Sequence, residues 1–189
     1  MKVSYLFALL FLFACKSGNV ASVDRPSQWA KPAHLGDLGN FYKLSDSVYR
    51  SQQPDRKEML QLKEFGIKTI VNFRNLNNDD HEARGTNLQL VHVPINTWKM
   101  SYDDLVKSVK AIADSEKPVL VHCIHGSDRT GAAIAGYRMV VEGWEKSAAI
   151  SEFRNGGYGF HERWFPNVLR LLEEVNVDSL RRDIRRLQD

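Results

Sequence analysis

Residues 119–136, with the sequence VLVHCIHGSDRTGAAIAG, constrain the fold of this chain more than any other stretch. The stretch opens with a short apolar run typical of a buried strand and closes with small residues typical of a tightly packed helix. Between them, Cys123 and Arg129 stand six positions apart, with Gly126 in the intervening loop. In open α/β sheets the loops at the carboxyl ends of strands bind ligands, so we expect a ligand site here.

Strand and helix patterns alternate along the rest of the chain. A helix is expected from Asp55 to a stop at Gly66, and a second helix behind Ser101 as its N-cap. Strands are expected as a hairpin over 41–51 and as buried strands over 67–73, 88–95 and 119–122, and further helices over 129–142, 146–154, 162–175 and 177–187. This alternation predicts an α/β domain with a central, mostly parallel sheet and helices on both faces.

Composition limits the kinds of partner that the protein can have. The 189 residues suggest one domain, and 43% hydrophobic residues are enough for a core. The net charge is only +3, and the sequence lacks the dense cationic stripes of nucleic-acid binders, so we expect no nucleic-acid partner. A mildly basic chain does suit a protein that handles small anions.

The first residues resemble a bacterial export signal. Lys2 precedes an apolar run over 3–14 that is too short to span a bilayer, which takes about 20 apolar residues. The sequence up to Cys15 resembles a lipoprotein processing box, in which Cys15 would be the acylated first mature residue. The alternative is a plain signal peptide cut near Ala21.

These features divide the chain into three parts and predict its location. We expect a signal peptide over 1–14, a flexible tether over 15–38 and the folded domain over 39–189. The protein would then be an exported, periplasmic or outer-membrane lipoprotein. Only one other cysteine, Cys123, is present, so a lipidated Cys15 leaves Cys123 as a thiol without a disulfide partner.

The loop after the strand at 119–122 has the composition of an anion site. Its N–H groups would face the space in front of a helix N-terminus, and Gly126 permits the tight turn in which amides converge. Arg129 adds a planar, charged fork that matches two phosphate oxygens. The same surroundings favour a thiolate at Cys123, which would be a nucleophile aimed at phosphorus. The alternative is an inert buried cysteine beside an arginine in a salt bridge.

The pattern His122-Cys123-x-x-Gly126-x-x-Arg129-Thr130-Gly131 resembles the CX5R signature loop of the cysteine-dependent protein tyrosine phosphatase superfamily, in its compact dual-specificity branch. The resemblance covers roughly residues 41–175. It implies a cysteinyl-phosphate intermediate and no metal or cofactor. By position, Cys123 would be the nucleophile and Arg129 would bind phosphate. The remaining substrate-binding residues would be Ile124, His125, Gly126, Ser127 and Thr130, the last donating a hydrogen bond to the sulfur.

The general acid departs from the usual family pattern. The upstream segment that normally carries an aspartate, here 95–100, contains no acid. Asp103 and Asp104 follow in the first turn of a predicted helix, where they complement its dipole. Asp128, inside the loop, resembles the loop aspartate of myotubularin-type lipid phosphatases and of bacterial phosphoinositide phosphatases. We therefore expect Asp128 to protonate the leaving group, with a helix cap as its alternative role.

Basic residues suggest the substrate. Arg50, Arg74 and Lys99 follow or end predicted strands, and His125 lies in the loop itself. If they surround the anion site, the substrate would carry several phosphates, as an inositol phosphate or a phosphoinositide headgroup does. Solvated surface charges are the alternative for each of them. Two other functions stay open: a phosphotyrosine or dual-specificity phosphatase acting on a phosphoprotein, and an inactive phosphate-binding module.

Overall fold

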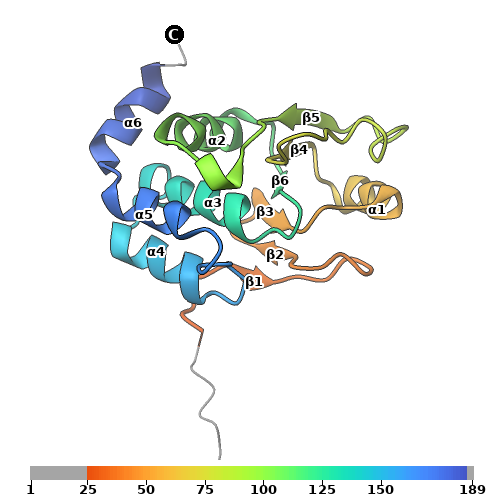
Figure 1. Ribbon diagram of the computed structural model, residues 1–189. Helices are drawn as coiled ribbons and strands as arrows, with labels where there is room; N and C mark the ends of the chain where they lie inside the picture. The colour runs from red at the N-terminus through yellow and green to blue at the C-terminus, as the bar shows by residue number, and fades with distance from the viewer. Residues whose placement is uncertain (1–24, 187–189) are drawn as a thin grey trace, which may run out of the picture.

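A sheet of six strands in the order β1-β2-β3-β6-β4-β5 runs through the protein, whose computed structural model describes residues 25–186 (Figure 1). The strands are β1 (Lys31–Pro32), β2 (Tyr42–Lys43), β3 (Val48–Ser51), β4 (Thr69–Asn72), β5 (Gln89–His92) and β6 (Val119–His122). The helices are α1 (Arg56–Phe65), the 3-10 helix η1 (Thr97–Lys99), α2 (Tyr102–Asp114), α3 (Asp128–Val140), α4 (Lys146–Asn155), α5 (Pro166–Glu174) and α6 (Val177–Arg186).

The central strands are parallel and in register. β6 pairs with β3 on one side and with β4 on the other, so that Ser51, Asn72 and His122 lie at the same edge of the sheet. The predicted hairpin is the antiparallel pair β2–β3. The mostly parallel sheet is therefore confirmed, and the loop that starts at Cys123 leaves from the carboxyl end of its central strand.

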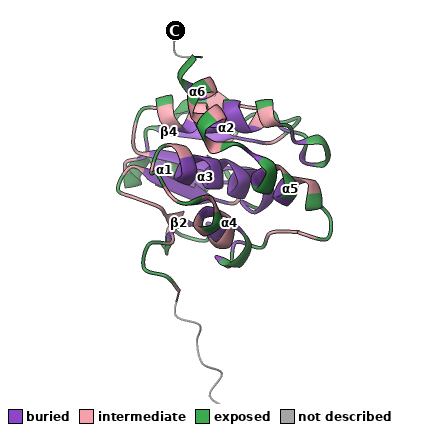
Figure 2. Cartoon of the chain, turned by 90° about the vertical axis from the view of Figure 1, so that its left-hand side faces the viewer, coloured by how far each residue is buried: buried purple, intermediate pink, exposed green. Residues whose placement is uncertain are grey.

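Helices cover both faces of the sheet, as predicted. Alternating side chains of β6 divide between two hydrophobic clusters: Val119 and Val121 pack on the side of α2 to α6, whereas Leu120 packs with Met59 and Leu62 of α1. Figure 2 shows α3 as an almost wholly buried helix between its neighbours. Its small residues explain this position, since a Cβ at Gly136 would lie 2.7 Å from a methyl carbon of Val109.

Local signals place most of the helix ends correctly. Asp55 caps α1 in a capping box, and Gly66, with a φ of 102°, ends that helix in the left-handed conformation. Ser101 caps α2 in the same way. The helix expected from residue 162 begins only at Pro166, because residues 162–164 form a turn and proline suits the first helical turn.

Two expectations are wrong. Residues 88–95 do not form a buried strand: β5 is the edge strand beside β4, and three of its four residues are exposed. A flexible tether is expected over 15–38, but the part of it that the structure describes, residues 25–38, packs on the folded domain. There β1 adds to the sheet beside β2, Leu38 is buried, and Arg25 donates to the carbonyl oxygens of Ala30 and Gly156.

The segment 1–24, with the predicted signal peptide and Cys15, lies outside the described residues. Within residues 25–186, none of the helices is long and apolar enough to span a bilayer.

Candidate active site

The loop between β6 and α3, residues 123–127, is held in place by hydrogen bonds that its carbonyl oxygens accept from other segments of the chain. The carbonyl oxygen of Ile124 accepts from the backbone N–H of Gln53 at 2.9 Å, and that of His125 accepts from Asn40 Nδ2 at 2.8 Å. The carbonyl oxygen of Gly126 accepts from Arg50 Nη2 at 2.5 Å. Three consecutive carbonyl oxygens of the loop thus accept hydrogen bonds from segments that are distant in the sequence.

The N–H groups of the same loop are available to a ligand. No described residue accepts a hydrogen bond from the backbone N–H of residues 124–127. Arg129, in the first turn of α3, donates from Nη1 to the carbonyl oxygens of Phe73 and Ile95 at 3.3 Å, while its buried Nε has no partner among the described residues. Donors without acceptors in front of a helix N-terminus are the arrangement that binds an oxyanion.

Gly126 is required at its position for two independent reasons. Its φ is +71°, in the left-handed region that L side chains rarely adopt. A Cβ there would also lie 2.3 Å from the carbonyl oxygen of Ser51, at the end of β3. The loop therefore packs directly against the neighbouring strand end.

Cys123 is 2% exposed and begins the loop directly after β6. Its neighbour His122 is oriented by two contacts, from Nδ1 to the carbonyl oxygen of Cys123 at 3.0 Å and from Nε2 to Asp79 Oδ2 at 2.8 Å. Asp79 also accepts from Arg74 Nη2 at 3.2 Å and from Gln53 Nε2 at 3.1 Å. This network anchors the carboxyl end of β6, where the nucleophile would stand.

Asp128 is the first residue of α3 and is 5% exposed. Its Oδ1 accepts from the backbone N–H of His161 at 2.9 Å, and its Oδ2 lies 3.0 Å from His161 Nδ1. The N-cap of α3 is Ser127, and its side chain makes no capping hydrogen bond. The carboxylate of Asp128 is thus bound to the segment before α5, which does not support the alternative role as a helix cap.

The loop opens into a hollow of about 250 Å³. Its lining is Thr97, Ile124, His125, Asp128, Arg129, His161, Trp164 and Phe165. Ile124 and Trp164 are 50% and 66% exposed, so that apolar side chains form the mouth while Asp128 and Arg129 lie deeper. The hollow therefore combines a charged floor with apolar walls.

The structure does not bring all the predicted basic residues into this hollow. Arg50 is 1% exposed and lies outside it, against the ring of Tyr158. Arg74 faces a separate hollow of about 570 Å³ with His81 and His92, and Lys99 is exposed on η1. These three cations are thus not among the residues that line this hollow, in contrast to the expectation from the sequence.

Thr130 is also placed differently from its expected contact. It is fully buried, and its Oγ1 has no hydrogen-bond partner among residues 25–186, so the expected hydrogen bond to the sulfur is not present. Ser127 is bonded instead, its Oγ donating to the carbonyl oxygen of Tyr158 at 2.6 Å. Of the predicted loop residues, Ile124 and His125 line the hollow, and Gly126 shapes the loop.

Four contributors were not predicted: Asn40, Asp79, Tyr158 and His161. Asn40 Nδ2 joins the loop to the segment before α5, since it donates to the carbonyl oxygens of both His125 and Tyr158. The glycine-rich sequence around Tyr158 indicates a loop but gives no sign of which element it contacts. No local signal identifies any of the four, because each acts on residues at least 31 positions away.

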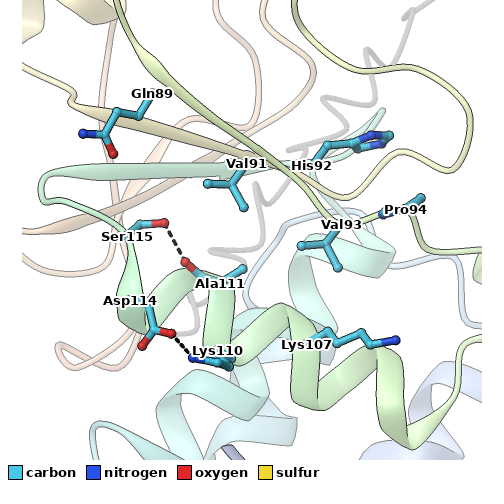
Figure 3. Close-up of a pocket in the computed structure, with 10 residues that line it drawn as sticks. All are labelled: Gln89, Val91, His92, Val93, Pro94, Lys107, Lys110, Ala111, Asp114 and Ser115. Atoms are coloured by element: carbon cyan, nitrogen blue, oxygen red, sulfur yellow. Dashed lines mark hydrogen bonds and ion pairs between the residues drawn. The ribbon is translucent and has the colours of Figure 1, made fainter. Parts of the chain in front are cut away.

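A larger hollow lies away from this site. It measures about 630 Å³ and lies between the edge strand β5 and helix α2, where Val91 and Val93 face Ala111 and the aliphatic parts of Lys107 and Lys110 (Figure 3). Lys110 there pairs with Asp114. Neither Arg129 nor any residue of the loop 123–127 lines this hollow, so it lacks the groups that phosphoryl transfer needs.

Comparison with known proteins agrees with the fold and identifies the family. Residues 45–143 match the family described as "Polymorphic toxin system, DSP-PTPase phosphatase", and the chain belongs to this family. The protein is therefore a member of the dual-specificity branch of the tyrosine-phosphatase-like phosphatases.

The names of individual relatives indicate two classes of substrate. The dual specificity protein phosphatase TpbA of Pseudomonas aeruginosa strain UCBPP-PA14 is 35% identical over 145 residues, which span 75% of this chain and 65% of that protein. A crystal structure of TpbA in complex with pTyr superposes with a TM-score of 0.75 at 29% identity, over 85% of this chain and 98% of the other. Inositol diphosphatase DSP3 of Arabidopsis thaliana is 26% identical over 162 residues, 78% of this chain and 77% of that protein.

Proposed function

We propose that the protein hydrolyses phosphomonoesters through a cysteinyl-phosphate intermediate, and that phosphotyrosine or another aryl phosphate is its preferred substrate. The observation that carries the proposal is the hollow in which Arg129 lies below apolar walls formed by Ile124, Trp164 and Phe165. An aryl phosphate matches both parts, since its phosphate needs the donors and its ring needs apolar contact.

The first step transfers the phosphoryl group to sulfur. The Cys123 thiolate attacks phosphorus, an S–P bond forms, and the P–O bond to the leaving group breaks. The N–H groups of residues 124–127 and the Arg129 guanidinium bind the equatorial oxygens, where negative charge is concentrated in the transition state. Asp128, protonated at this stage, gives its proton to the leaving oxygen.

The second step returns the enzyme to its starting state. Water attacks phosphorus, the S–P bond breaks, and the thiolate of Cys123 leaves. Asp128, now a carboxylate, takes the proton of the attacking water, so the products are inorganic phosphate and the free enzyme. His161 positions the carboxyl group throughout, through its backbone N–H and its ring.

The positions of the basic residues favour an aryl phosphate over the inositol phosphate that was expected from the sequence. An inositol polyphosphate would need cations around the reacting phosphate, and Arg50, Arg74 and Lys99 lie outside the hollow. Two observations still support an inositol phosphate as a second candidate. The imidazole rings of His125 and His161 line the mouth, where an N–H group can donate to a further phosphate, and the relative DSP3 is named an inositol diphosphatase.

A substrate panel tests this proposal. A phosphotyrosine peptide, inositol hexakisphosphate and a phosphoinositide are assayed for released phosphate, with Cys123→Ser as the control for the loop. We expect kcat/KM to be largest for the phosphotyrosine peptide and activity to vanish in Cys123→Ser. A higher kcat/KM for an inositol substrate would favour the second candidate. Phosphate binding without turnover of any substrate would favour the inactive module.

We also propose export, on the grounds of residues 1–14 and Cys15 alone. Mass spectrometry of the mature protein, purified from the membrane fraction of a bacterial host, tests this. An N-terminal acylated Cys15 supports the lipoprotein. A mature chain that begins near Ser22, directly after Ala21, would support a plain signal peptide.

A further inference from the structure

Three potential metal ligands converge at the mouth of the hollow. They are His125 of the loop, Asp128 at the start of α3, and His161 in the segment before α5. One ligand atom from each lies within 4.8 Å of the others. The rings of His125 and His161 are in contact, with centroids 5.4 Å apart. Two separate segments of the chain thus supply two imidazoles and one carboxylate to the same point.

The geometry points to a binding site for a single zinc ion, formed by His125, Asp128 and His161. Ligand atoms at about 2.1 Å from a tetrahedral ion lie about 3.4 Å apart. The 3.0 Å between Asp128 Oδ2 and His161 Nδ1 is close to this spacing. The exposed side chain of His125 has room to move into the third position.

The ligand types select the metal. Imidazole nitrogens favour Zn²⁺ among the common cellular cations, whereas Mg²⁺ and Ca²⁺ prefer sets of oxygen ligands. Three protein ligands leave one position of a tetrahedral ion open to water or to a phosphate oxygen. Arg129 and the positive N-terminus of α3 oppose a dication, so we expect micromolar rather than nanomolar affinity.

Zinc at this point would inhibit the enzyme reversibly. The ion would engage the carboxylate of Asp128, which then cannot deliver a proton to the leaving group. It would also stand at the mouth of the hollow, in the path of the substrate. This inhibitory role rests on the proposed phosphatase activity, whereas the binding of the ion does not.

The binding test uses untagged protein that carries Cys123→Ser, because the thiolate is itself a zinc ligand. Zinc is titrated by calorimetry and by competition with a chromophoric chelator. We expect one equivalent to bind, and the affinity to fall at least about ten-fold when His161→Ala or His125→Ala is added. His34→Ala removes a histidine outside the hollow and is the matched control. No binding, or equal binding in His161→Ala, would overturn the site.

The inhibition test uses the same histidine variants on the active parent with Cys123. Each is compared with its own zinc-free rate, and a chelator is added afterwards to restore activity. We expect His161→Ala to raise the zinc concentration for half inhibition about ten-fold, and His34→Ala to leave it unchanged. Equal inhibition of all variants would overturn the inhibitory role of this site. A chain that binds zinc but has no activity without zinc would contradict the proposed function and leave the metal site standing.

Discussion

Arg50 Nη2 donates to the carbonyl oxygen of Gly126 at 2.5 Å, so that a cation buried at the end of β3 holds the loop between β6 and α3 from outside. The guanidinium also lies 3.6 Å from the centroid of the Tyr158 ring. Burial lowers the pKa of Arg50, and Coulombic interactions, chiefly with Tyr158 and Glu152, oppose this lowering. Arg50 therefore supports the loop from behind, and its side chain is not among those that line the hollow.

Replacing Arg50 is expected to disturb the structure of the loop. Arg50→Met removes the donor to Gly126, and we expect a loss of roughly 1.5–3 kcal/mol in the free energy of unfolding, because the bond involves a charged group. We also expect kcat to fall at least about ten-fold. Urea unfolding and steady-state kinetics measure both. Lys99→Met is the matched control: both quantities should stay near the parent values, and equal effects in the two variants would contradict this role.

Gly126→Ala tests the close contact between the loop and β3. The added Cβ would meet the carbonyl oxygen of Ser51 at 2.3 Å, so the loop must shift and its amides must lose their convergence. We expect a decrease of at least about 10²-fold in kcat, comparable to the loss of one oxyanion donor. The control is Gly143→Ala, at the same φ of +71° but with no atom within 4 Å. If both variants lost activity equally, the steric argument would be wrong.

Asp128→Asn tests the general acid. An amide cannot donate the proton, so we expect kcat to decrease by about 10²–10⁴ for a phosphotyrosine peptide. The decrease should be much smaller for an aryl phosphate with an acidic phenol, which leaves without a proton. Asp103→Asn, on the exposed first turn of α2, is the control. Parent-like rates of Asp128→Asn on both substrates would exclude this role.

Asp79→Asn tests the hydrogen-bond network behind Cys123, the proposed nucleophile, through the pH dependence of stability. Burial would raise the pKa of Asp79, but the hydrogen bond and charge of His122, the hydrogen bond of Gln53 and the charge of Arg74 outweigh it and hold the pKa below its ordinary value. The stabilisation is therefore fully present above the unfolded pKa of about 3.9 and is lost as the pH falls through the lower folded pKa.

We accordingly expect Asp79→Asn to lower the free energy of unfolding at pH 7 by roughly 1.5–3 kcal/mol. The difference from the parent protein should narrow as the pH falls below about 3.9. Urea unfolding across roughly pH 2.5–7, the range set by this linkage, measures it. The exposed neighbour Asp80→Asn is the control. A difference that stayed constant into the acid range would show that the carboxylate charge is not responsible.

The sequence alone determined the elements that depend on residues close together in the chain. The N-caps Asp55 and Ser101 and the stop at Gly66 were predictable because a cap interacts with atoms within four residues of itself. The same holds for the loop between β6 and α3, since a strand, a glycine and a helix N-terminus in succession already bring several N–H groups together. The class of chemistry follows from this local pattern.

Only the tertiary structure decided which residues complete the site. Asn40, Arg50 and His161 reach the loop from segments 33 to 85 positions away, and their roles depend on how the sheet edge and the segment before α5 pack together. A basic residue near a strand end looks the same in the sequence whether it faces a substrate or supports a backbone carbonyl. Its direction is set by the packing of distant elements, because burial of a charge is tolerated only where such a partner is found.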